Sequence, residues 1–183
     1  MKTILINTNG LLGVSTSKYS IEKIQKTDSY MTYRPIQIAD YFLSKYGKDN
    51  EITPMKLIKL VYIAHGWYLA ITDQTLIDEN PEAWKYGPVI SSLYHEFKHL
   101  GNSPIEKKFT KKVKLEEKAE KFLDKIWEVY GKFSATDLSS KTHQPETPWS
   151  KTWNSVKNAN YLSLQIPENE IKNYYKSMKL ETI

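Results

Sequence analysis

The chain has 183 residues, a size that matches one domain or one domain with an appendage. Hydrophobic residues make up 40% of it, including 5 Trp, 13 Tyr and 5 Phe, which is enough for a core and argues against wholesale disorder. No apolar run approaches the roughly 20 residues of a membrane span, and the net charge of +5 is interspersed rather than striped, so it does not favour a nucleic-acid partner.

Two regions of different character are expected along the chain. Residues 1–32 are predicted to be an N-terminal extension without a signal peptide, in which Thr3–Ile6 is a candidate strand followed by a Gly-Leu-Leu-Gly turn. Residues 33–183 are predicted to form a single helical domain. Its first helix is expected to begin at Pro35 and to end at Gly47, because apolar residues recur at helical spacing between them.

The segment at about 54–72 is predicted to be a long central helix. Thr53 can cap this helix, and Pro54 suits its first position, where no backbone donor is needed. Apolar residues fill most of its circumference and leave mainly Lys56 and Lys59 as polar positions. A helix of this kind is normally buried at the centre of a bundle.

Shorter elements follow the central helix. The polar connection 75–82 allows a scrap of strand at Leu76-Ile77, and the next segment, EAWKYGPV, is broken by Gly87-Pro88 and is expected to be a rigid turn. A third helix is expected to begin at Ile90 and to stop at Gly101. The basic linker 102–114 allows a short strand.

The last third of the chain is predicted to be helical. An amphipathic helix ends at Gly131, a helix capped by Ser134 ends near His143, and two more begin at Pro148 and Pro167. The expected fold class is therefore all-α: a compact bundle of six or seven helices around a buried central helix, with room for one short β-hairpin.

One motif points to metal chemistry. His95, Glu96 and His99 match the H-E-x-x-H pattern of zinc hydrolases, in which two imidazoles share a helix face beside a glutamate. Against a metal, Lys98 places a cation beside the site, and neither the glycine nor the third histidine of the extended motif is in place after Gly101. We expect two surface histidines without metal or cofactor, and a zinc-dependent hydrolase stays the alternative.

No other residue pattern predicts catalysis. His65 lies on the apolar side of the central helix and is expected to be a core histidine, hydrogen-bonded to a backbone carbonyl or a tyrosine. Neither a phosphate-binding glycine loop nor a nucleophile–base pair is present. The chain has no cysteine, which excludes disulfides and cysteine-ligated zinc and agrees with a cytoplasmic location. We expect no enzyme activity.

Two segments are candidates for binding a protein partner. A short loop can bury only some of its aromatic side chains, and exposed Trp and Tyr held by Gly-Pro are anchors with little entropy to lose. The loop residues of this kind are Trp84, Lys85 and Tyr86. The linker supplies the other candidates, a group of lysines that could contact an acidic partner: Lys107, Lys108, Lys111 and Lys112.

Three stretches together resemble a known family. KLIKLVYIAHGWYLA, EAWKYGPVISSLYHEFKHLG and LSSKTHQPETPW resemble the Panacea family, the SocA-like antitoxin domain of bacterial and prophage toxin–antitoxin pairs. The resemblance runs from about Ile36 to about Trp153. Besides Trp84 and Tyr86, it assigns to the family motif, mainly as scaffold, Gly87, Pro88, Tyr94, His143, Pro148 and Trp149.

The resemblance implies a cytoplasmic, non-enzymatic antitoxin. Such a protein neutralises a cognate toxin by binding it or, as one family member does, by handing it to a cytoplasmic protease. The surface that recognises the toxin is then expected in residues 1–30, in the 73–82 connection and in the basic linker. Two alternatives stay open: a phage or prophage accessory protein that counters host defence by binding, and a DNA-binding autoregulator with salt-dependent affinity.

Overall fold

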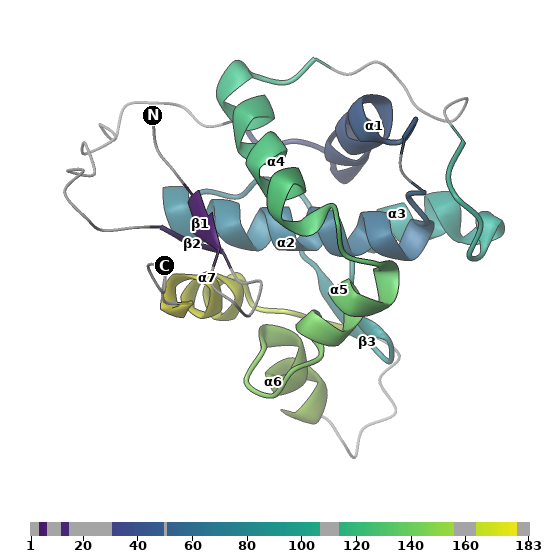
Figure 1. Cartoon of the computed structure of the whole chain (residues 1–183). Helices are drawn as coiled ribbons and strands as arrows, with labels where there is room; N and C mark the ends of the chain where they lie inside the picture. Colours follow the sequence, from purple (N-terminus) through teal and green to yellow (C-terminus); the bar gives the residue numbers. More distant parts are fainter. Residues whose placement is uncertain are drawn as a thin grey trace.

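The computed structural model describes residues 4–6, 12–14, 31–49, 51–106, 114–155 and 164–178. Within these ranges, helices pack around one central helix, α2 (Figure 1), with the bounds α1 Pro35–Tyr46, α2 Pro54–Thr72, α3 Ser91–Phe97, α4 Glu117–Tyr130, α5 Ala135–Thr142, α6 Pro148–Ser155 and α7 Glu168–Ser177. In this view α1 and α4 lie above α2, and α6 and α7 lie below it. The predicted fold class, a mostly helical bundle around a buried central helix, is confirmed.

Helix α2 has the bounds that its sequence predicts. The Thr53 side chain accepts a hydrogen bond from the Lys56 amide, and Pro54 occupies the first turn. Side chains are buried around the whole circumference of the helix because α1, α3, α4, α5 and α7 all pack against it. Lys56 and Lys59, its two polar positions, are buried as well.

A small antiparallel sheet is attached to the bundle. It has the order β4-β3-β5, formed by β3 Glu82–Trp84, β4 Gly87–Val89 and β5 Leu164–Gln165. The prediction of a rigid turn at EAWKYGPV is wrong, because this segment forms a hairpin in which Glu82 pairs with Val89 and Trp84 pairs with Gly87. The turn is confined to the two residues between the strands. The predicted fold class allows one short β-hairpin beside the helices, and this is that hairpin.

Other expectations for short segments are met in part. Strand β1 Ile4–Ile6 pairs antiparallel with β2 Leu12–Val14, so the predicted strand is present, but the expected glycine turn overlaps β2. Ile77 forms a parallel bridge with Tyr33. Helix α3 ends at Phe97 and continues as the 3-10 helix η1 Lys98–Leu100 before Gly101. The linker strand expected between residues 107 and 113 lies outside the described residues. No helix of the described chain is long and apolar enough to span a bilayer.

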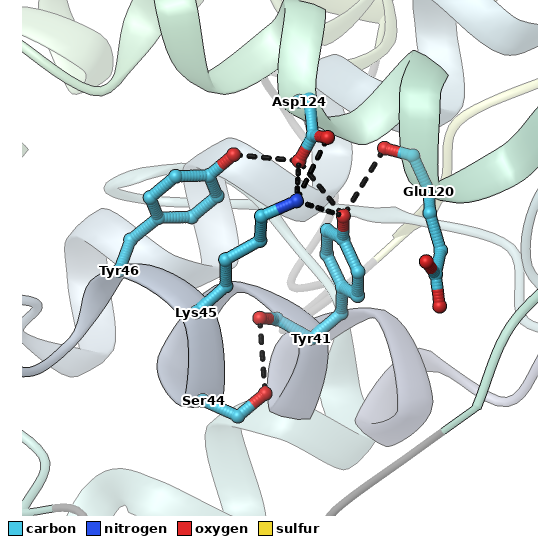
Figure 2. Close-up of polar contacts among 6 residues, drawn as sticks. All are labelled: Tyr41, Ser44, Lys45, Tyr46, Glu120 and Asp124. Carbon is cyan, nitrogen blue, oxygen red and sulfur yellow. Dashed lines mark hydrogen bonds and ion pairs between the residues drawn. The ribbon is translucent and has the colours of Figure 1, made fainter. Parts of the chain in front are cut away.

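A carboxylate joins α1 to α4 on one side of the bundle (Figure 2). The Asp124 side chain of α4 accepts hydrogen bonds from Lys45 Nζ at 2.7 Å, Tyr46 Oη at 2.6 Å and Tyr41 Oη at 2.7 Å, all from α1. Burial alone would raise the pKa of Asp124, but these three donors outweigh it and hold the pKa below its usual range. We call these four residues the Asp124 cluster.

Asp124→Ala is expected to lower the free energy of unfolding by about 2 kcal/mol at pH 7, because three donors lose a charged acceptor. Since the native pKa is lowered, this stabilisation is present above the unfolded pKa of about 4 and is lost as pH falls through the native pKa. Urea unfolding at pH 7 and pH 3 measures both, and the deficit of the variant should shrink at pH 3. Glu117→Ala, which removes an exposed pair with Lys121 on the same helix, is the control and should leave stability nearly unchanged.

Candidate functional site

The residues that the sequence resemblance assigns to the family motif meet at the hairpin formed by β3 and β4. Three alternate carbonyl groups of this hairpin accept hydrogen bonds from side chains of the bundle. Trp149 Nε1, on α6, donates to the Trp84 carbonyl at 2.8 Å. Lys59 Nζ, on α2, donates to the Tyr86 carbonyl at 3.1 Å and to the Pro88 carbonyl at 2.9 Å. The hairpin backbone is therefore held from inside the protein at residues 84, 86 and 88.

Lys59 is a buried lysine that donates hydrogen bonds to backbone carbonyls. Its side chain is 2% exposed, and burial lowers its pKa to about 7. Both of its hydrogen bonds go to carbonyl oxygens, which favour the ammonium form. Lys56, one turn earlier on α2, is also buried and donates to the Gly131 carbonyl at 2.7 Å. The two lysines thus connect α2 to two different backbone segments.

Gly87 lets the hairpin approach Lys59 and the end of α5. Its φ of 102° is a conformation that side-chain-bearing residues rarely adopt. A Cβ at this position would lie 2.4 Å from Lys59 Nζ and 2.6 Å from Cε1 of His143. Neither Lys85 nor Tyr86 has a positive φ, so the tight connection uses the following glycine in their place.

His143 occupies the end of α5, next to the hairpin. Its Nδ1 lies 2.7 Å from the Ser139 carbonyl oxygen, so Nδ1 carries the proton and donates it. The imidazole centroid lies 4.2 Å from that of Trp149. His143 thus holds its own ring against the last turn of α5. Pro148, at the start of α6, is buried directly before Trp149.

The side chains of the hairpin loop, Lys85 and Tyr86, point outward from this backbone. Tyr86 is 69% exposed, and Lys85 Nζ lies 5.4 Å from the centroid of its ring. Trp84 is half-buried and donates from Nε1 to Glu82 at 2.7 Å. Tyr94 of α3 is 37% exposed and meets the Trp84 ring edge-on at 4.8 Å between centroids. The site presents aromatic side chains on a backbone that is held by hydrogen bonds from the bundle, an arrangement suited to binding a protein.

The H-E-x-x-H residues lie on the surface. His95 and Glu96 are exposed on α3, and His99 is exposed on η1, beyond the end of α3. His95 Nδ1 lies 3.3 Å from Lys98 Nζ. In the part of the chain that the structure describes, no third histidine or carboxylate joins these side chains to form a metal-binding group. Among the described residues, His95, Glu96 and His99 therefore do not complete a catalytic zinc site.

His65 is a core residue, as its position on α2 predicts, but the prediction that it is hydrogen-bonded to a backbone carbonyl or a tyrosine is wrong. It is fully buried, and burial lowers its pKa to about 4, so it is neutral at pH 7. Among the described residues neither ring nitrogen has a hydrogen-bond partner, and neither does the Tyr62 hydroxyl one turn earlier. Helix α7 faces this part of α2 with the ring of Tyr175, which lies over Gly66.

Some candidates could not be placed, and one residue was missed. Lys107, Lys108, Lys111 and Lys112 lie outside the described residues. Lys59 was not predicted to belong to the site. The signal for it is a lysine in the middle of a helix that has no polar face, because such a lysine must find its acceptors inside the protein.

Comparison with known proteins gives the chain its relatives. The family model described as "Antitoxin SocA-like, Panacea domain" matches residues 57–150, a range that includes the hairpin, Lys59, His143 and Trp149. Antitoxin SocA of Caulobacter vibrioides (strain NA1000 / CB15N) is 26% identical over 155 residues, which cover 78% of this chain and 82% of that protein. No solved structure matches the chain. The chain belongs to the SocA-like, Panacea-domain family of antitoxins.

Proposed function

We propose that this protein neutralises a cognate protein toxin by binding it directly, and that the hairpin loop is part of the binding surface. Residues 33–183 would form the antitoxin domain, with residues 1–32 as an extension. The observation that carries the proposal is the match to an antitoxin family over residues 57–150, which contain the hairpin. The protein would act in the cytoplasm, as a binding partner and not as an enzyme.

The geometry of the hairpin supports its role in binding. Tyr86 combines a large exposed ring with a backbone that is hydrogen-bonded from α2, so little conformational entropy is lost when a partner covers the ring. Tyrosine and tryptophan are enriched among residues that dominate binding energy. Trp84 of β3 and Tyr94 of α3 add an aromatic pair next to the loop, and Lys85 adds a positive charge at the loop. The linker lysines 107–112 would contact an acidic region of the toxin.

Co-expression with the adjacent gene tests the function. If the neighbour encodes the toxin, we expect that its expression stops growth, that this protein restores growth, and that the two purify as one complex. Rescue that disappears in cells lacking a cytoplasmic protease would instead indicate delivery for degradation. Failure to restore growth or to bind any neighbouring gene product would contradict the antitoxin proposal.

Tyr86→Ala is expected to weaken toxin binding about 10- to 100-fold, because truncation of a central aromatic contact typically costs more than about 1 kcal/mol and up to several. Isothermal titration calorimetry with purified toxin measures the effect. The melting temperature should not change, since the ring is exposed. Ile71→Ala, at an exposed apolar residue near the end of α2, is the control and should bind with unchanged affinity. Equal affinities for Y86A and the wild type would place the toxin elsewhere on the surface.

A further inference from the structure

The burial of the Lys59 amine calls for a reason beyond packing. An ammonium group removed from water loses several kcal/mol of hydration, and an apolar side chain at residue 59 would avoid this loss. Apart from Lys56, the residues of α2 around it are apolar. In the described part of the chain no carboxylate forms an ion pair with Lys59. Its two carbonyl acceptors are therefore the main compensation for burying it.

Both acceptors belong to the hairpin and flank its glycine. The Tyr86 and Pro88 carbonyls come from residues two apart in the chain, and Gly87 between them provides the space for the amine. A single side chain therefore fixes the peptide group that follows Tyr86 and the one that follows Pro88. These contacts determine the path of the backbone at Tyr86, whose side chain is 69% exposed.

We infer that Lys59 is the positioning residue of the toxin-binding surface: its ammonium holds the hairpin loop in one conformation and so presents Lys85 and Tyr86 to the partner. This inference rests on the proposed function, because it assigns a role within the same surface. Lys59 itself touches no partner, since it is buried beneath the hairpin. It acts through the two carbonyls, and its contribution to binding is preorganisation.

Loss of the two Lys59 hydrogen bonds should change the hairpin loop already in the protein without toxin. Without the two hydrogen bonds, the loop samples other conformations, and only a fraction of molecules present Tyr86 correctly. The apparent dissociation constant rises in inverse proportion to that fraction. A hairpin that is correctly formed about one-tenth of the time would weaken binding about 10-fold.

The test compares Lys59→Met with Lys56→Met, two substitutions of buried lysines one turn apart on α2. Lys56 also donates to a backbone carbonyl, but that carbonyl belongs to Gly131, at the end of α4. We expect K59M to raise amide hydrogen exchange in residues 82–89 at least about 10-fold without toxin, and to weaken toxin binding by a similar factor. K56M should leave exchange in the hairpin and toxin affinity unchanged, and should raise exchange near Gly131.

The outcomes separate the inference from the proposed function. Unchanged exchange in the hairpin of K59M would overturn the role of Lys59 and leave the antitoxin proposal intact. Faster exchange with unchanged toxin affinity would mean that the hairpin is not part of the toxin-binding surface, and would overturn the inference in that way. Lys59→Gln, whose side chain is one bond shorter and uncharged and so should not reach both carbonyls, replaces K59M if the latter does not fold and should show a local increase in the same residues. Unfolding of both variants would make Lys59 a residue of global stability and would also overturn the inference.

Discussion

Gly66→Ala is expected to displace α7 from α2 and to lower the free energy of unfolding by about 2 to 4 kcal/mol. A Cβ at residue 66 would lie 2.1 Å from Cε2 and 2.4 Å from Cδ2 of Tyr175. The Tyr175 ring cannot move aside cheaply, because it is 4% exposed and packs edge-on against Trp67 at 5.3 Å between centroids. Alanine gains about 1 kcal/mol of helix propensity over glycine, which is too little to offset the overlap.

Thermal unfolding should place the melting temperature of G66A about 5 to 15 °C below that of the wild type, the shift expected for this loss in a chain of this size. Hydrogen exchange should rise first in α7, since the overlap is with its buried face. The double variant G66A/Y175A provides the control: once the ring is gone, the alanine should add little further loss, so the two effects should not be additive. A wild-type melting temperature for G66A would mean that α2 and α7 separate without cost at this point.

The helices were predictable because their signals are local. Thr53-Pro54 begins α2 where its cap and first-turn preferences indicate, and Ser134 with Asp137 forms the capping box that begins α5. These interactions join residues within one turn of helix, so a short stretch of sequence contains both partners. The same holds for Gly101, whose φ of 55° suits the end of η1.

The hairpin and the buried lysine depend on contacts that are distant in the sequence. Gly87-Pro88 indicates a turn, but the sheet also requires β5, whose Gln165 pairs with Glu82 from the far end of the chain. The sequence shows Lys59 only as a polar position of α2, and a lysine is usually solvated. It can be buried because the carbonyls of residues 86 and 88 accept hydrogen bonds from its amine. The sequence around residue 59 does not indicate which groups these acceptors are. The Asp124 cluster likewise joins two helices far apart in the chain.

Gly87→Ala is expected to have the largest effect on function, lowering toxin affinity by about 100-fold or more. Alanine at a φ of 102° is strained by about 1 to 3 kcal/mol before any contact is considered. The new Cβ would also lie 2.4 Å from Lys59 Nζ and 2.6 Å from His143 Cε1. Relief requires that the lysine leave its carbonyls, that His143 leave the Ser139 carbonyl, or that the hairpin move outward. Withdrawal of the lysine and movement of the hairpin both break the Lys59 hydrogen bonds, so the loop should lose its fixed position while the helices remain folded.

Gly101→Ala separates the backbone strain from the loss of contacts. Gly101 also has a positive φ, of 55°, but a Cβ there would meet no atom within 4 Å. We expect G101A to lose about 1 to 3 kcal/mol of stability through backbone strain and to bind toxin with unchanged affinity. Calorimetric titration of both variants, with hydrogen exchange of residues 82–89, measures the difference. If G87A and G101A bind equally well, the close approach of the hairpin to Lys59 and His143 has no part in recognition. If only G87A fails while its helical circular dichroism is retained, recognition depends on where the bundle holds this loop.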